Sequence, residues 1–556
     1  MAMNLADLFE HAADAFGDRI AVACGDRQVT YAELEERANR LAHHLAGLGV
    51  GPGDHVGLYA RNSLEAAETL IASCKLRAAA VNINYRYVEN ELRYMLADAD
   101  LAVLVHDDAL APRVAAVAPG TPGLRGTVVI DDGSGAAAAA PAPAAAGRSE
   151  RTGYAAALAA ASPERDFPPR SADDVYLIYT GGTTGYPKGV MWRHEDIWRT
   201  LGGGIDFLTG VPLPDEWSQS RRGLEAAGLV KLCAAPLIHG NAQVATLAGL
   251  FSGETIVLLP RFGADQVWRA VERHKVNVLV IIGDAMARPL VDAYRAGSYD
   301  ASSLVAISSS AALFSPAVKD ACTEALPSVL ITEAIGSTET GFAGLGFVSA
   351  GAPSRGGPTV TPGPDTIVLD DADRPVVPGQ VGRLARGGHL PLGYYNDPAR
   401  TAAMFAEVDG RRYAVPGDWA RLEEDGSVTL LGRGNTCVNT GGEKVFPEEV
   451  EGALKSHPDV FDALVIGVPD ERLGQRVAAL VQPRPGRAVD LATLGPHVRG
   501  LIAGYKVPRS VWLVESIGRT AAGKADYGWA RRHAAGHPPA SQVPASTGST
   551  AAGPAR

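Results

Sequence analysis

Residues 179–190 read Tyr179-Thr-Gly-Gly-Thr-Thr-Gly-Tyr-Pro-Lys-Gly-Val190, a glycine- and threonine-rich stretch between two apolar runs, 175–179 and 190–192. The pattern predicts a strand, a polar loop and a second strand. Glycines without Cβ allow backbone N–H groups to close on phosphate oxygens, threonine hydroxyls add donors, and Lys188 supplies a positive charge. Pro187 before Lys188 departs from the Walker pattern, in which Gly-Lys-Ser/Thr opens a helix. The stretch therefore predicts a polyphosphate site of another kind.

The composition is that of a globular protein. The chain has 556 residues, 46% hydrophobic and 20% charged, which is enough for several packed lobes. A formal net charge of −11 without a basic tract argues against nucleic acid or an anionic membrane as a partner. Residues 1–10 lack a basic n-region, and no apolar run is long enough to span a bilayer, so we expect no integral membrane segment and a cytoplasmic location.

The cysteines favour neither a disulfide framework nor a zinc site. They are five, an odd number, widely scattered and without a CxxC pair. We expect buried free thiols.

Most of the chain alternates helical stretches with short apolar runs. Thr30 and Glu33 form a capping-box pattern ahead of a helix. The strand-like runs are 101–105, 128–130, 257–259 and 278–282. Strands covered by helices predict an α/β layer structure.

The chain divides into domains by composition and pattern. We expect a large, multi-lobed α/β N-terminal domain over residues 1–434 and a small α+β C-terminal domain over residues 435–532. Residues 133–147 are almost entirely Ala, Pro and Gly, which predicts a surface insertion because proline prevents a continuous helix. Residues 533–556 are rich in Pro, Ala, Ser, Thr and Gly and are expected to form a flexible tail.

The complete string at 179–190 resembles the signature of the adenylate-forming superfamily, which comprises acyl-CoA synthetases, nonribosomal peptide adenylation domains and firefly-type luciferases. The resemblance implies that this loop binds the phosphates of ATP and that Thr184 also takes part in catalysis. The implied phosphate-binding residues are Thr180, Gly181, Gly182, Thr183, Thr184, Gly185 and Lys188.

A second motif, 335–339, resembles the family's aromatic-Gly-x-Thr-Glu sequence. The resemblance implies that Glu339 meets the Mg²⁺ of MgATP, and a hard cation held mainly by phosphates needs only one or two protein carboxylates. Ile335 replaces the usual aromatic residue, so it offers adenine an apolar face without ring stacking. The other residues implied at adenine are Gly336, Ser337 and Thr338 on one side and Ser310 and Ala311 on the other.

Four further motifs resemble the parts of the family that bind ribose, join the domains and carry the catalytic lysine: Tyr413–Asp418, Leu431–Gly434 with its Gly-Arg pair, Gly441–Glu451, and the Arg-Thr-x-x-Gly-Lys sequence Arg519–Lys524. The resemblance also implies that the C-terminal domain is mobile. The implied roles are Asp418 for the ribose hydroxyls, Arg433 for ribose or phosphate, Asn435 for the hinge, Gly441 and Gly442 for the coenzyme A channel, and Lys524 for catalysis. Attack of a carboxylate on the α-phosphate brings two anions together, and an ammonium group can neutralise the charge that develops.

The resemblance also implies a substrate class. The strings 191–196, 283–289 and 504–509 look most like actinobacterial fatty-acid and steroid-side-chain acyl-CoA synthetases, and the implied acyl-pocket residues are His239, Gly283, Asp284 and Ser309. The expected enzyme is an acid-thiol ligase. It forms an acyl-AMP from a carboxylic acid and MgATP and transfers the acyl group to coenzyme A, with a homodimer as an allowed assembly.

Other readings stay open within and outside this class. Within it, the acceptor could be a carrier protein, the acid an amino acid, or the reaction a luciferase-like oxidation. Outside it, the chain could be a silent nucleotide-binding relative that keeps the fold without the chemistry. The polar residues Lys188, Glu339, Asp418, Arg433 and Lys524 are all present, which favours an active enzyme.

Overall fold

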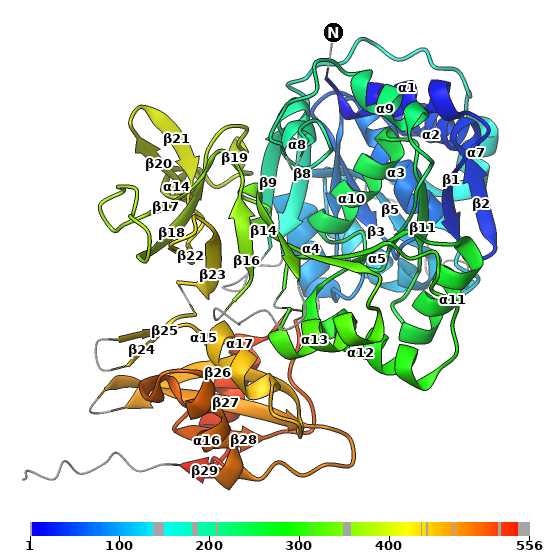
Figure 1. Cartoon of the computed structure of the whole chain (residues 1–556). Helices are drawn as coiled ribbons and strands as arrows, with labels where there is room; N and C mark the ends of the chain where they lie inside the picture. The colour runs from blue at the N-terminus through cyan, green and yellow to red at the C-terminus, as the bar shows by residue number, and fades with distance from the viewer. Residues whose placement is uncertain are drawn as a thin grey trace, which may run out of the picture. The chain divides into compact units, whose positions relative to one another are not determined.

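A computed structural model describes residues 3–136, 150–180, 187–206, 209–312, 314–348, 357–434, 436–440, 443–470, 473–520 and 524–542. The chain forms two compact units, an N-terminal one made almost entirely of residues up to 430 and a C-terminal one made mainly of residues from 431 (Figure 1). The division falls close to the predicted boundary after residue 434.

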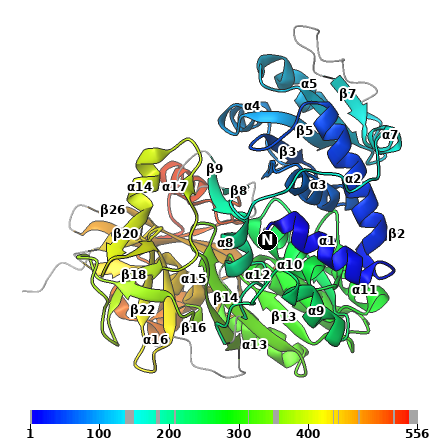
Figure 2. The same cartoon turned by 90° about the horizontal axis from the view of Figure 1, so that it is seen from above.

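The N-terminal unit contains a wholly parallel sheet in which all strands except the edge strand Glu150–Gly153 are buried on both faces. Its strand order is β4 (Ala79–Asn82), β3 (His55–Tyr59), β5 (Leu101–Asp107), β6 (Gly126–Ile130) and β7 (Glu150–Gly153). Helices α4 (Glu89–Asp98) and α5 (Ala111–Val117) pack on one face. Helices α2 (Tyr31–Gly47), α3 (Leu64–Lys75) and α7 (Tyr154–Ala160) cover the other face (Figure 2).

A second, larger sheet has a parallel part and forms the other half of this unit. The parallel order is β1 (Ile20–Cys24), β11 (Thr255–Leu258), β10 (Val230–Cys233), β12 (Val278–Ile281), β13 (Ala306–Ser309) and β14 (Leu330–Ser337), with β2 (Arg27–Thr30) antiparallel at the edge. Helices α11 (Ala264–His274), α12 (Gly283–Ala296) and α13 (Pro316–Ala325) cover one face. Helices α1 (Leu5–Phe16) and α10 (Gly240–Phe251) join α2 and α3 in one hydrophobic core that contacts both sheets. The predicted α/β layers are confirmed.

Antiparallel strands extend the larger sheet. They are β15 (Gly341–Val348), β16 (Thr359–Pro362), β17 (Thr366–Leu369), β18 (Val381–Arg386), β20 (Phe405–Val408), β21 (Arg411–Ala414), β22 (Asp418–Leu422) and β23 (Val428–Arg433). A separate antiparallel sheet holds β8 (Val175–Thr180), β9 (Lys188–Arg193) and β19 (Gly393–Tyr394). The short helices α8 (His194–Thr200) and α9 (Ser218–Glu225) lie between β9 and β10, and α14 (Pro398–Met404) connects β19 to β20.

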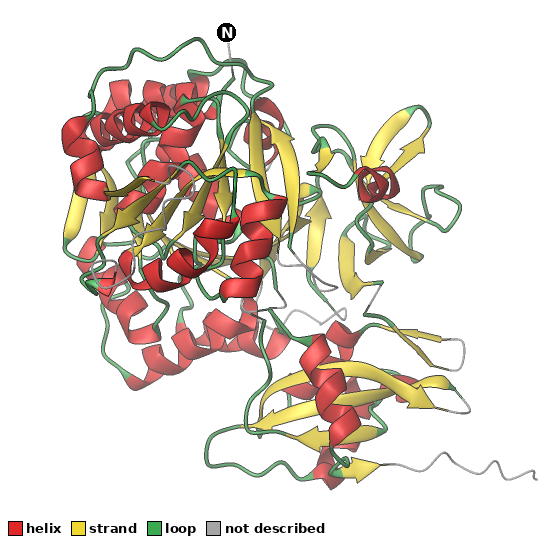
Figure 3. Cartoon of the chain, turned by 180° about the vertical axis from the view of Figure 1, so that it is seen from behind, coloured by secondary structure: helices red, strands yellow, loops and turns green. Residues whose placement is uncertain are grey.

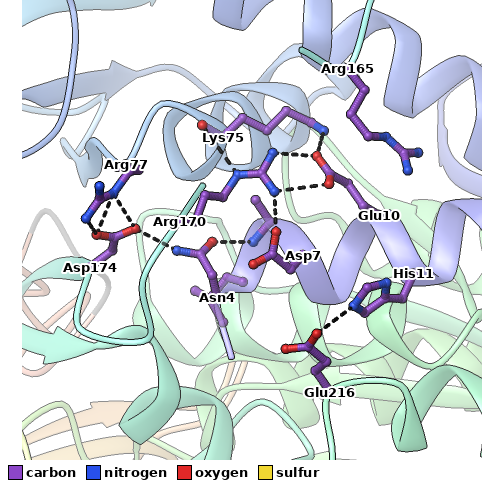
Figure 4. A network of polar contacts seen from close by, with 12 residues as sticks. Asn4, Asp7, Glu10, His11, Lys75, Arg77, Arg165, Arg170, Asp174 and Glu216 are labelled. Carbon is purple, nitrogen blue, oxygen red and sulfur yellow. Dashed lines mark hydrogen bonds and ion pairs between the residues drawn. The ribbon is translucent and has the colours of Figure 1, made fainter. Parts of the chain in front are cut away.

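A buried ionic network fastens α1 to α3 and to the segment before β8 (Figure 4). The Lys75 ammonium is 0% exposed and donates to Glu10 at 2.5 Å and Glu35 at 2.8 Å. Arg170 donates to both carboxylate oxygens of Glu10, to Oε1 at 2.6 Å and to Oε2 at 3.0 Å. Arg77 has a φ of 59°, a backbone conformation that favours glycine, and its guanidinium forms a bidentate pair with Asp174 at 2.9–3.1 Å. The ion pair offsets part of the backbone strain.

The C-terminal unit is a mixed sheet with helices on both faces (Figure 3). The strand order is β25 (Glu443–Val445), β24 (Val438–Thr440), β27 (Gly474–Pro483), β28 (Ser510–Leu513) and β29 (Ser541–Gln542), and β26 (Val460–Asp470) also pairs with β27. Helices α15 (Pro447–Lys455) and α16 (Leu491–Leu501) pack on one face and α17 (Tyr527–Gly536) on the other. The alternation of Val465 and Ile466 between these two cores follows the two-residue period of a strand.

The end of the C-terminal unit differs from the prediction of a flexible tail from residue 533. Helix α17 continues to Gly536, the Trp512 Nε1–H donates to the His537 carbonyl at 2.9 Å, and β29 pairs with β28. Residues 533–542 are therefore part of this unit, because they complete its helix and its sheet edge. Residues 543–556 and 137–149 lie outside the described residues, and the second range includes most of the Ala/Pro-rich segment 133–147.

The cysteines are free thiols, as predicted. Cys74, Cys233 and Cys322 are buried and Cys24 is partly buried. Burial raises the pKa of Cys24 to about 11 and that of Cys74 and Cys322 to about 12, and it also raises the pKa of Cys233. Among the helices of the described ranges, none has the length and hydropathy that a bilayer crossing requires.

Candidate active site

Several predicted site residues of the N-terminal unit follow parallel strands of the larger sheet. Strands β10, β12, β13 and β14 run parallel, so their carboxyl ends lie at one edge. Gly283 comes two residues after β12, Ser310 follows β13, and Ser337 ends β14. Ligands of open α/β sheets bind at the carboxyl ends of the strands. This edge is the candidate active site.

The two strands that flank the phosphate loop are confirmed. Thr180 ends β8 and is the register partner of Lys188, which begins β9. The Tyr94 hydroxyl donates to the Pro187 carbonyl at 3.0 Å and supports the exit from the loop. Gly181, Gly182, Thr183, Thr184 and Gly185 lie outside the described residues, so their roles stay predictions.

Asn82, at the end of β4, fixes the entry to the loop. Its amide group donates to the carbonyls of Tyr179 at 2.8 Å and Ile238 at 2.6 Å, and its carbonyl accepts from the Tyr179 N–H at 2.8 Å. Asn82 is 5% exposed, so these bonds are shielded from water. The sequence reasoning missed this residue, although a polar side chain that ends a buried parallel strand is a usable signal.

A tight turn over residues 337–340 presents Glu339. The Ser337 hydroxyl accepts the backbone N–H groups of Glu339 and Thr340 at 3.2 Å each, and the Trp192 Nε1–H donates to the Thr338 carbonyl at 2.9 Å. A Cβ at Gly336 would lie 2.1 Å from the Gly341 carbonyl oxygen, so the close approach of β14 and β15 before the turn requires glycine. The motif residues therefore shape the turn that carries the acid.

Glu339 and Lys188 come from different motifs, and both contact the side chain of Tyr394. The Tyr394 hydroxyl donates to Glu339 Oε1 at 3.0 Å, and the Lys188 ammonium lies 5.5 Å from the centre of the Tyr394 ring. Glu339 is 7% exposed. A nearly buried carboxylate beside a phosphate-loop lysine fits Mg²⁺ bound mainly through the phosphates of ATP. In the described ranges no three His, Cys, Asp or Glu side chains could hold a metal ion together.

The residues predicted at adenine have different surroundings. Ala311 is exposed after β13 and has a φ of 64°, a strained conformation for a residue other than glycine. Ser310, beside it, is partly buried. Ile335 is 4% exposed and packs in a hydrophobic core with Ala343 and Val360. The contact between Ile335 and adenine stays a prediction.

The predicted acyl-pocket residues form two groups at the same sheet edge. Ser309 and Gly283 are linked, because the Gly283 N–H donates to Ser309 Oγ at 3.0 Å. Asp284, next in the first turn of α12, is buried. His239 is the N-cap residue of α10 and is partly buried. A Cβ on Gly240 would lie 3.1 Å from Ile178 and 3.9 Å from the Thr338 hydroxyl, so this helix start adjoins β8 and the Glu339 turn.

Asp418 begins β22 in the N-terminal unit, directly after Gly417, whose φ is 96°. Its side chain is buried. Its contact with ribose stays a prediction.

Arg433 ends β23, and its carbonyl accepts from the Thr436 N–H at 3.1 Å and from the Thr436 hydroxyl at 2.8 Å. Gly432 before it has a φ of 129°, and a Cβ there would lie 2.1 Å from a Glu448 carboxylate oxygen. The glycine of the Gly-Arg pair is thus favoured by its own backbone conformation and by the close approach of Glu448. Asn435, Gly441 and Gly442 lie outside the described residues.

Lys524 closes a turn within the C-terminal unit. The Thr520 N–H donates to the Lys524 carbonyl at 2.7 Å, and the Lys524 N–H donates to the Thr520 hydroxyl at 3.2 Å. Arg519 pairs with Ala525 in an isolated antiparallel bridge and forms an ion pair with Asp462. Burial alone would raise the pKa of Asp462, but the cations Lys455 and Arg519 lower it. The arginine and threonine of the motif therefore fix the position of the Lys524 backbone.

Family comparisons match both units. The family described as AMP-binding enzyme matches residues 9–395, and the family described as AMP-binding enzyme C-terminal domain matches residues 449–524. The 3-oxocholest-4-en-26-oate–CoA ligase of Rhodococcus rhodochrous is 54% identical over 96% of each chain. The medium/long-chain-fatty-acid–CoA/3-oxocholest-4-en-26-oate–CoA ligase of Mycobacterium tuberculosis is 53% identical over 97% of each chain.

Solved structures share the fold. The ATP-bound form of MatB from Rhodopseudomonas palustris is 26% identical, with a TM-score of 0.77 over 96% of this chain and 99% of that one. The anthranilate CoA ligase AuaEII in complex with anthranoyl-AMP has a TM-score of 0.79 over 95% of this chain and 96% of that one, at 24% identity.

Proposed function

The chain belongs to the family of AMP-binding enzymes, and we propose that it is an acyl-CoA synthetase for a fatty acid or a steroid side-chain carboxylic acid. The observation that carries this proposal is an identity of 51–54% with ligases of such acids over nearly the whole chain. The arrangement of Glu339, Tyr394 and Lys188 supports it, because it joins a carboxylate to a phosphate-loop lysine.

The first half-reaction joins the acid to AMP. A carboxylate oxygen of the substrate attacks the α-phosphorus of ATP, a new P–O bond forms, and pyrophosphate leaves. Bound Mg²⁺ would neutralise phosphate charge, and Glu339 is the residue proposed to hold it. Lys188 is proposed to bind the phosphates and Lys524 to neutralise charge that develops at the α-phosphate. Asp418 and Arg433 are proposed to bind the ribose.

The second half-reaction is proposed to use coenzyme A. The sulfur of coenzyme A attacks the acyl carbonyl, the C–O bond to AMP breaks, and a thioester forms as AMP leaves. Gly441 and Gly442 are proposed to line the pantetheine channel, with Asn435 as the hinge between the half-reactions. We propose the cytoplasm as the location, because ATP and coenzyme A are available there. A homodimer is a further proposal, which light scattering of the purified protein tests.

A panel of acids tests the proposal. Short, medium and long fatty acids, a steroid side-chain acid and amino acids are each incubated with MgATP and coenzyme A, and AMP and thioester release are measured. We expect both products with the medium or long fatty acids or the steroid acid. Selectivity for amino acids would contradict the substrate class. A thioester that forms on a carrier protein but not on coenzyme A would contradict the acceptor.

A further inference from the structure

We propose that Tyr394 is a positioning residue that sets Glu339 for the metal ion of MgATP and Lys188 for its phosphates. The inference rests on the proposed function and adds a residue that belongs to none of the motifs recognised in the sequence. Tyr394 contacts one residue from each of two of those motifs, Glu339 and Lys188.

The backbone of Tyr394 is held firmly in place. Strand β19 pairs with β9, with Tyr394 opposite Val190, so it lies next to the exit of the phosphate loop. The Tyr394 N–H donates to the Thr401 hydroxyl at 2.9 Å. A Cβ on Gly393, whose φ is 145°, would lie 2.3 Å from Thr401 Cγ2. Strand pairing on one side and α14 on the other therefore leave the tyrosine little freedom.

The Tyr394 side chain makes a different contact with each functional group. Its phenol donates one hydrogen bond to Glu339 Oε1, which fixes the orientation of the carboxylate. Its ring face attracts the Lys188 ammonium through the quadrupole of the aromatic ring. The carboxylate and the ammonium are thus oriented before ATP arrives, which reduces the ordering cost of binding.

The neighbouring residue provides a matched control. Tyr395 has the same side chain and also donates to a carboxylate, Asp100 Oδ2, at 2.8 Å. The two tyrosines follow each other on the chain, but Asp100 is not a predicted site residue. Tyr395→Phe therefore removes an equivalent hydrogen bond without touching Glu339.

The test is a measurement of ATP binding by calorimetry, without acid or coenzyme A, in the presence and absence of Mg²⁺. We expect Tyr394→Phe to weaken binding of MgATP by about tenfold, because it removes a hydrogen bond to a charged group. Binding of ATP without Mg²⁺ should change much less. Tyr394→Leu, which also removes the ring, should weaken both, and Tyr395→Phe should match the wild type.

Several results would overturn the inference. Equal MgATP affinity of Tyr394→Phe and wild type would do so, and so would an equal loss with and without Mg²⁺, since that indicates a general packing role. Failure of the proposed function is distinguishable, because a wild-type chain that forms acyl-AMP from no acid in the panel would contradict the function whatever Tyr394 does. Circular dichroism melting of each variant separates loss of folding from loss of binding.

Discussion

We propose that Lys524 acts in the first half-reaction and not in the second. Hydrogen bonds between Thr520 and the Lys524 backbone and the bridge between Arg519 and Ala525 hold the backbone of Lys524, and truncation of the lysine side chain leaves these bonds in place.

We therefore predict that Lys524→Ala reduces acyl-AMP formation by at least about a hundredfold, since it removes charge stabilisation during attack on the α-phosphate. Thioester formation from a supplied acyl-adenylate should be close to that of the wild type. Acid-dependent exchange of pyrophosphate into ATP measures the first step and thioester release the second. An equal loss in both would contradict the assigned role.

A second prediction concerns His194 and the pH dependence of the free energy of unfolding. His194 is 0% exposed, and its Nδ1 accepts the Leu5 N–H at 3.3 Å. Burial lowers the pKa of His194 to about 4 from an ordinary value of 6.5. Between these values the unfolded chain binds the proton more readily than the folded chain, so stability falls as the pH is lowered through this window, by about 3 kcal/mol in all.

Urea unfolding midpoints between pH 4.5 and 7 check this prediction. His194→Asn keeps an acceptor for the Leu5 N–H but does not titrate, so its midpoint should depend less on pH than that of the wild type. His43→Asn, a partly exposed histidine of the same unit, controls for the substitution itself. A pH dependence of His194→Asn as steep as that of the wild type would show that other groups cause it.

At the level of elements, segments with a periodic apolar pattern were predictable from the sequence, whereas ionic contacts between distant segments were not. The sequence pattern predicts the capping box of α2 and the strands β5, β6, β8, β9, β11 and β12 where the structure has them, because burial imposes a recognisable pattern of apolar residues. The Lys75 and Arg170 network joins residues up to 163 positions apart, and no local pattern encodes such contacts. The sequence analysis missed Tyr394 for the same reason, since its partners Glu339 and Lys188 lie on other elements.

The C-terminal strand supports a prediction about truncation. A chain that ends at Gln542 should be as stable as the full chain. A chain that ends at Arg532 should be destabilised by about 2 kcal/mol, because it loses the last turn of α17, the bond from Trp512 to His537 and the β29 pairing. Thermal melting and hydrogen exchange of the β28 amides measure the difference. Equal protection of β28 in both chains would show that residues 533–542 contribute nothing.

For the whole molecule, the motifs predicted the class of enzyme better than the contacts of its substrate. The polar motif residues have chemical roles that a short sequence can carry, whereas a pocket is shaped by side chains from several elements. Gly283 with Ser309, and Gly240 with Thr338, come together only through the parallel sheet.

Binding of a stable intermediate analogue gives a prediction at this scale. An acyl sulfamoyl adenosine carrying a steroid or long-chain acyl group should raise the melting temperature, because a ligand that binds only the folded chain stabilises it by mass action. At a hundred times its Kd the gain is about 2.7 kcal/mol. The aminoacyl analogue should have little effect. A larger shift with the aminoacyl compound would contradict the proposed substrate class.

The state of the cysteines has a consequence for an enzyme that makes a powerful acylating agent. An acyl-adenylate can modify any thiolate it meets, including those of the protein that formed it. Burial holds Cys24, Cys74, Cys233 and Cys322 in the neutral thiol form at physiological pH. These four side chains are therefore poor competitors with an incoming thiol for the activated acyl group.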